Sequence, residues 1–182
     1  MSIPSRQAVA SVAIRTVAVG AMSAGAAGLV VQRVVVQRSE ARATAAILRP
    51  LIGSAQTIGT AVILPVGSGD QLTWVGFAVT TGCTVALLGV PFLLVAAALV
   101  AAGRASVPRA LRALGFAGAA LLAGNLTRLV LLGLGVRWLG FPEGFDRLHV
   151  VLGATASTAG LALGILGFVR TLLGHRTLEQ TA

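Results

Sequence analysis

The sequence predicts an all-α polytopic membrane protein with about four transmembrane helices, an interfacial helix and a small extracytoplasmic β-hairpin before the second span. Of its 182 residues, 56% are hydrophobic and only 10% are charged, whereas a soluble domain carries about 25% charged residues. The mean hydropathy is +0.92, and several apolar stretches reach the roughly 20 residues that a helix needs to cross a bilayer. We therefore expect one membrane domain over residues 1–182.

Four stretches are predicted to span the membrane. Residues 83–102 and 149–169 contain neither arginine nor an acid. Residues 113–136 are long enough but include two strongly polar side chains, and residues 8–31 are rich in alanine and glycine but contain Arg15. Because Arg15 interrupts the apolar core that a signal peptide would need, we interpret the first stretch as a retained anchor.

The segment after the first span is amphipathic. In residues 32–49, charged side chains alternate with valine, alanine and leucine, a pattern typical of a helix that lies in the membrane interface. Pro50 is expected to end this helix, since proline lacks a backbone N–H and clashes with the preceding turn. A fifth span over residues 43–66 is the alternative, but its prolines and arginine make it a poor one.

A β-hairpin is predicted over residues 57–80. Residues 57–65 and 72–80 are short runs rich in valine, isoleucine, threonine and aromatic side chains, joined by Gly-Ser-Gly-Asp at 67–70. Two such runs around a glycine-containing turn are typical of a hairpin. The second run leads directly into Cys83, which places the thiol at a membrane surface.

Alternation of the spans brings distant residues to one membrane face. Cys83, the C-terminal half of the third span and His149 are expected to approach the same face. His175, in a tail of residues 170–182, is expected on the opposite face.

Loop charge predicts which face is cytoplasmic. The short loop 103–112 carries three arginines and no acid, whereas the loop 137–148 balances two arginines with two acids. Because positively charged short loops stay inside, Cys83 is predicted to face outward from the plasma membrane and the tail to be cytoplasmic. The four arginines of residues 32–49 oppose this orientation.

Composition excludes several classes of partner and site. The 14 basic residues, all arginine, exceed the five acids and give a net charge of +9. Most flank apolar runs, where arginine contacts the headgroups of the lipid bilayer, so nucleic acid is not an expected partner. One cysteine cannot form an intramolecular disulfide, and one Cys with one His on a face falls short of a metal site. We predict no metal and no cofactor.

Arg128 is the most informative residue of the third span. Its guanidinium stays charged and costs at least ~2.5 kcal/mol near a helix centre, so an intramembrane arginine indicates a functional site. The alternative is snorkelling, since Arg128 lies about eight residues, roughly 12 Å, from the predicted helix end. Asn125, three residues earlier on nearly the same face, is expected to bond a neighbouring helix and to orient Arg128.

Cys83 and His149 each have a structural and a chemical interpretation. Free cysteines are often packing residues, but a helix N-terminus favours the thiolate, which is the nucleophile. His149 could be an interfacial histidine behind an Asp146 cap. Together with Arg128, however, the two supply a nucleophile, a proton shuttle and a stabiliser of oxyanion charge.

Three short motifs carry a family resemblance. They are Thr-Gly-Cys at 81–83, Asn-Leu-Thr-Arg at 125–128 and Asp-Arg-Leu-His at 146–149. In these motifs the chain resembles the exosortase/archaeosortase group of integral-membrane sorting enzymes, over about residues 40–169. The resemblance implies a catalytic Cys83, Arg128 and His149, and cleavage near a C-terminal tail made of a short motif, a transmembrane helix and a basic cluster.

The expected function is that of a cysteine protease or transpeptidase acting on membrane-tethered proteins. The resemblance also implies transfer of the exported protein to a surface acceptor, with water, a lipid or a glycan amine left open. The alternative is a non-enzymatic four-helix membrane subunit or small transporter, in which Arg128 contacts an anion or a partner helix. That alternative needs Arg128 but not Cys83.

Overall fold

The computed structural model describes residues 6–67, 71–141 and 143–173. Its described elements are long helices, a small sheet and a short 3₁₀ turn, in the order α1 (Arg6–Val31), α2 (Arg33–Ile52), β1 (Gln56–Ile58), β2 (Ala61–Val66), β3 (Thr73–Ala78), η2 (Thr81–Cys83), α3 (Ala86–Ala101), α4 (Val107–Leu139) and α5 (Glu143–Leu173).

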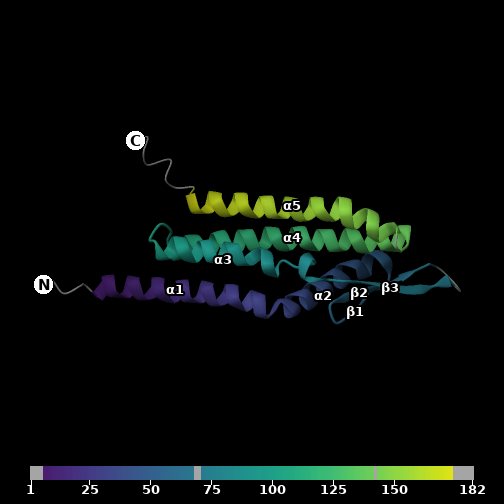
Figure 1. The fold of residues 1–182 in the computed structure, drawn as a ribbon, viewed down its shortest axis with the longest axis horizontal. Helices are drawn as coiled ribbons and strands as arrows, with labels where there is room; N and C mark the ends of the chain where they lie inside the picture. The colour runs from purple at the N-terminus through teal and green to yellow at the C-terminus, as the bar shows by residue number, and fades with distance from the viewer. Residues whose placement is uncertain (1–5, 68–70, 142, 174–182) are drawn as a thin grey trace.

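Helices α1, α3, α4 and α5 lie side by side along the long axis (Figure 1), with α1 packed on α3, α3 on α4, and α4 most extensively on α5. The start of α1, the α3–α4 turn and the end of α5 lie at one end of this bundle, whereas α2 and the sheet lie at the other. The chain therefore passes back and forth along the bundle, as the alternation of spans predicts.

Three of the described helices are long and apolar enough to cross a membrane: Ala10–Val31, Val107–Leu139 and Gly153–Leu173. This is the arrangement of a multi-pass membrane protein. Helix α3 is equally apolar but has 16 residues, about 24 Å at 1.5 Å per residue. The predicted second span, residues 83–102, is therefore too long at its start, because residues 81–83 form η2 and the helix begins at Ala86.

Local hydrogen bonds explain this late start. Thr84 has an extended backbone (φ −108°, ψ 146°), and its hydroxyl accepts a hydrogen bond from the Ala86 N–H at 3.3 Å. A threonine hydroxyl that accepts from the amide two residues on makes a local turn that competes with helical hydrogen bonding. The chain thus reaches the helical conformation only after Thr84.

Two of the helices extend beyond the predicted spans. Helix α4 begins at Val107 rather than 113, and α5 runs from Glu143 to Leu173 rather than from 149 to 169. Hydropathy marks only the part of a helix that crosses hydrocarbon, whereas backbone hydrogen bonding continues beyond it. Residues 174–182 of the predicted tail lie outside the described residues.

Helix α2 continues through Pro50, so the prediction that this proline ends it was wrong. The helix ends at Ile52, where Gly53 adopts φ +81° and donates its N–H to the Arg49 carbonyl at 3.0 Å. A glycine with positive φ is a common helix C-terminus because it lacks Cβ. Pro50 lies in the last turn, where it removes one hydrogen bond only.

One face of α2 is buried in the protein rather than exposed to lipid. Ala41, Thr44 and Leu48 are fully buried at helical spacing, and α2 contacts both α4 and β2. Leu48 fits against Gly133 of α4, where an added Cβ would lie only 2.5 Å from Leu48 Cδ1. The amphipathic pattern predicted the helix, but its apolar face covers α4 and the sheet.

The predicted hairpin is present as β2 and β3, with an additional strand. The sheet is three-stranded and antiparallel, in the order β1-β2-β3, and Val62 pairs with Phe77. The predicted first strand, residues 57–65, is divided at Gly59 (φ +61°) by a tight turn that pairs Ile58 with Ala61. Residues 68–70 of the predicted turn lie outside the described residues.

Candidate functional site

A cavity of about 290 Å³ lies where the sheet meets α4 and α5. Its lining includes apolar side chains and two reactive or charged groups, and consists of Ala78, Thr80, Gly82, Cys83, Arg128, Leu129, Leu132 and Phe145. Cys83 and Arg128, which the sequence places on separate elements, thus line one space.

Cys83 is half-buried and is the last residue of η2. Its N–H donates to the Thr80 carbonyl at 2.9 Å, and its own carbonyl accepts a hydrogen bond from Asn125 Nδ2 at 2.9 Å. The thiol therefore precedes α3 by a short connection instead of lying at the helix start, as the sequence suggested. The backbone on both sides of Cys83 is held by hydrogen bonds.

The guanidinium of Arg128 lies beside this cavity, and few of its N–H donors have a partner among the described residues. In the described part of the chain, its hydrogen bonding is limited to a long contact of 3.4 Å from Nη1 to the Ser157 hydroxyl, and its buried Nε has no hydrogen-bond partner. A guanidinium carries five N–H donors. An anion or a developing oxyanion in the cavity would satisfy donors for which the described residues show no partner.

Gly153 makes room for this side chain. A Cβ at position 153 would lie 3.0 Å from Arg128 Nε and 3.6 Å from its Cγ. The absence of a side chain thus lets Arg128 of α4 lie directly against the backbone of α5.

Position 149 lies on the same face of α5 as these contacts. Residues 145, 149, 153 and 157 are spaced by four, so they follow one face of a helix. Phe145 lines the cavity, and Gly153 and Ser157 both contact Arg128. The helix therefore places position 149 between two of its contacts with the site, while the side chain of His149 is outside the described residues, as is His175.

Asn125 links the turn that carries Cys83 to helix α2. It is buried, and Nδ2 donates both to the Cys83 carbonyl at 2.9 Å and to Glu40 Oε1 at 3.0 Å. The expected bond to a neighbouring helix is thus made with α2. Both bonds use Nδ2, whereas a guanidinium can bond only to the amide oxygen, so the orientation of Arg128 by Asn125 stays a prediction.

Glu40 is the residue of this site that the sequence analysis missed. It is 2% exposed, and Oε1 accepts from the Val85 N–H at 2.9 Å as well as from Asn125. Burial raises the pKa of this carboxyl, and its hydrogen bonds, that from the Val85 N–H foremost, offset part of that rise. Glu40 is the one acid among the arginines of residues 32–49, a signal that could have singled it out.

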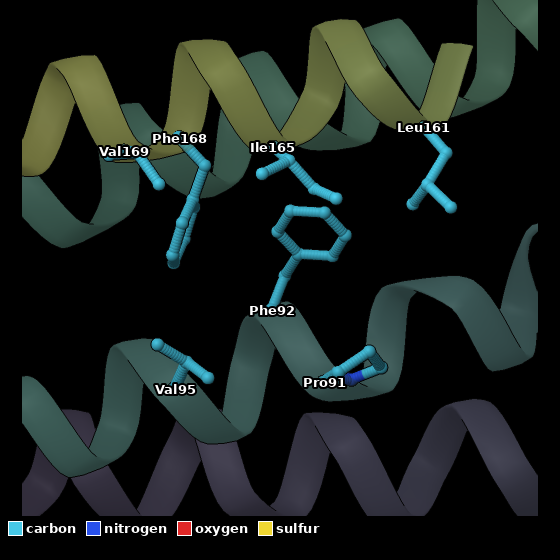
Figure 2. A pocket seen from close by; sticks show the side chains of 7 residues that line it. All are labelled: Pro91, Phe92, Val95, Leu161, Ile165, Phe168 and Val169. Atoms are coloured by element: carbon cyan, nitrogen blue, oxygen red, sulfur yellow. The ribbon is translucent and has the colours of Figure 1, made fainter. Parts of the chain in front are cut away.

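A second cavity of about 290 Å³ lies between α3 and α5, and its lining is entirely apolar (Figure 2). Side chains from the two helices point toward each other there, and the Phe92 and Phe168 rings meet edge to face with centroids 5.2 Å apart. Without a polar group it offers no chemistry, so the cavity beside Cys83 is the candidate site.

Comparison of the chain with family models, curated proteins and solved structures finds no match. The case for the site is therefore built from the residues and geometry described above.

Proposed function

We propose that the chain is a membrane-embedded cysteine protease or transpeptidase that cleaves C-terminal sorting signals of exported, membrane-tethered proteins. The observation that carries the proposal is the shared cavity of Cys83 and Arg128. A thiol nucleophile and a guanidinium beside one space are two components of acyl transfer. The resemblance of the three short motifs to exosortases and archaeosortases supports the same chemistry.

The proposed cycle has two steps. His149 takes the proton of the Cys83 thiol, Sγ attacks the scissile carbonyl carbon, and His149 then protonates the leaving amine as the C–N bond breaks. In the second step His149 deprotonates the acceptor, which is water or an amine of a lipid or glycan, and the acceptor displaces Sγ from the thioacyl enzyme. Arg128 stabilises the oxyanion in both steps. The proposed cycle uses no metal or cofactor.

The site is proposed to face outward from the plasma membrane. The α3–α4 connection and the start of α4 carry Arg104, Arg109 and Arg112, and they lie at the end of the bundle opposite to α2 and the sheet (Figure 1). Basic short loops stay in the cytoplasm. A cysteine at Ser68 in a Cys83→Ser background should therefore react with an impermeant maleimide on intact cells, and labelling only after lysis would reverse the orientation.

The decisive experiment is co-expression with a protein from the same genome that bears a tripartite tail. Cys83→Ala should abolish removal of the tail at normal membrane abundance. The Arg128 donors for which the described residues show no partner also suit a subunit or transporter that binds an anion. That alternative predicts that Cys83→Ala leaves the function of the protein unchanged. A fully active Cys83→Ala protein would exclude the enzyme.

A further inference from the structure

Glu40 reaches the Cys83 turn from a helix that is distant in sequence. Its carboxyl oxygen Oε1 receives two hydrogen bonds, one from the Val85 N–H at 2.9 Å and one from Asn125 Nδ2 at 3.0 Å. The other hydrogen of that amide goes to the Cys83 carbonyl at 2.9 Å. The Glu40 carboxyl thus holds the Val85 N–H directly and the Cys83 carbonyl through the Asn125 amide.

Satisfying the start of α3 does not by itself require a buried acid. An exposed helix start usually receives its hydrogen bond from a Ser, Thr, Asp or Asn a few residues away, and Thr84 already serves the Ala86 N–H. Burying a carboxyl is costly, and here the second oxygen, Oε2, is buried without a hydrogen-bond partner. The buried Glu40 carboxyl thus lies where it restrains the residues around Cys83, although its burial is unfavourable.

The restraint acts on the stretch of the cavity wall that connects β3 to α3. Arg128 and Phe145 belong to long helices, whereas Gly82 and Cys83 belong to a 3₁₀ turn of three residues. Such a short turn has few internal hydrogen bonds, so the position of the thiol depends on contacts from α2 and α4.

We propose that Glu40 is a positioning residue of the Cys83 site, which holds the turn carrying the thiol through Val85 and Asn125. The inference rests on the proposed function only in treating the thiol as the reactive group. Helix α2 thereby gains a role in holding the Cys83 turn, which no motif of the sequence indicates.

Alkylation of the thiol tests this positioning without requiring enzyme activity. The chain contains a single cysteine, so the rate at which the full-length protein in membranes reacts with a small neutral maleimide reports on Cys83 alone. Glu40→Ala removes both hydrogen bonds to the carboxyl and should raise the alkylation rate about tenfold, the change in a local opening equilibrium expected when a hydrogen bond to a charged group is lost.

Three variants define the result. Glu40→Gln keeps an acceptor oxygen and should stay within about twofold of the wild type, since the geometry is retained. Thr44→Ala, one turn later on the same buried face of α2, removes a hydroxyl that donates to the Glu40 backbone carbonyl at 2.8 Å and leaves the contacts of the Glu40 carboxyl in place. It therefore controls for the loss of a buried hydrogen bond in α2 and should leave the rate unchanged. Asn125→Ala breaks the link from the other side and should raise the rate even if Glu40→Ala does not accumulate.

The outcomes separate this inference from the proposed function. If Cys83 were alkylated at the wild-type rate in both Glu40→Ala and Asn125→Ala, the positioning role would be overturned. It would also be overturned if Thr44→Ala or Glu40→Gln raised the alkylation rate as much as Glu40→Ala does. Cleavage of the tailed substrate should fall in Glu40→Ala with a lower kcat and be rescued in Glu40→Gln. Activity of Cys83→Ala would refute the proposed function and leave the alkylation result standing.

Discussion

A close contact between α4 and α5 at Gly124 yields a prediction that depends only on the fold. A Cβ added at Gly124 would lie 2.8 Å from the Gly160 Cα and 3.1 Å from the Ala156 carbonyl oxygen. Carbon atoms in good contact are about 3.5–4.0 Å apart, so Gly124→Ala would force the two helices apart by about 1 Å. Because the atoms met are backbone, no side chain can rotate away to relieve the overlap.

A matched glycine isolates the energy of this contact. Gly118 lies on the same helix, and a Cβ there would meet nothing within 4 Å. Replacing glycine by alanine inside a helix gains up to about 1 kcal/mol at either position, so this gain cancels in the comparison. Overpacking costs ~1–3 kcal/mol, and Gly124→Ala should therefore be less stable than Gly118→Ala by that amount.

Reversible unfolding of the two variants in the same detergent would measure this difference. The strain should also reach the site, because Arg128 follows Gly124 by one turn and its contacts with Gly153 and Ser157 are made across the same helix pair. If Gly124→Ala were as stable as Gly118→Ala, the close packing of α4 on α5 would be wrong.

Three further predictions concern the site. His149→Ala should abolish tail processing while His175→Ala leaves it near normal, as measured by tail cleavage in cells; equal loss in both would argue against the assignment of the active-site face. Arg128→Lys keeps the charge but loses the planar fork, and tail cleavage should slow by ~10²–10³; a near-normal rate would mean that Arg128 acts only as a point charge. Since the pKa of Glu40 is raised in the folded protein, the folded state binds its proton more tightly than the unfolded state, and stability should fall as the pH rises above about 4.5. Melting curves from pH 4 to 8 should show a smaller fall for Glu40→Gln, and parallel curves would contradict the assignment.

The sequence by itself determined the class of protein and the positions of most elements. Apolar content is a local property, and a stretch such as residues 149–169 must be buried in lipid or protein whatever its neighbours are. The hairpin could likewise be predicted from β-branched runs around a turn. The importance of Arg128 could be predicted from the cost of a charge in an apolar helix. Alternation of the spans was enough to predict that Cys83 and Arg128 approach one end of the bundle.

Only the tertiary structure decided how those residues are held. Glu40 and Asn125 are 85 residues apart, and nothing local to either indicates that one carboxyl oxygen bonds the other's amide and the backbone of Val85. The late start of α3 and the use of α2 to cover α4 and the sheet were also missed, because they depend on the same partners. A hydropathy pattern reports which surfaces avoid water, whereas hydrogen-bond partners and close glycine contacts depend on which surfaces meet, and that is fixed by packing between segments far apart in the chain.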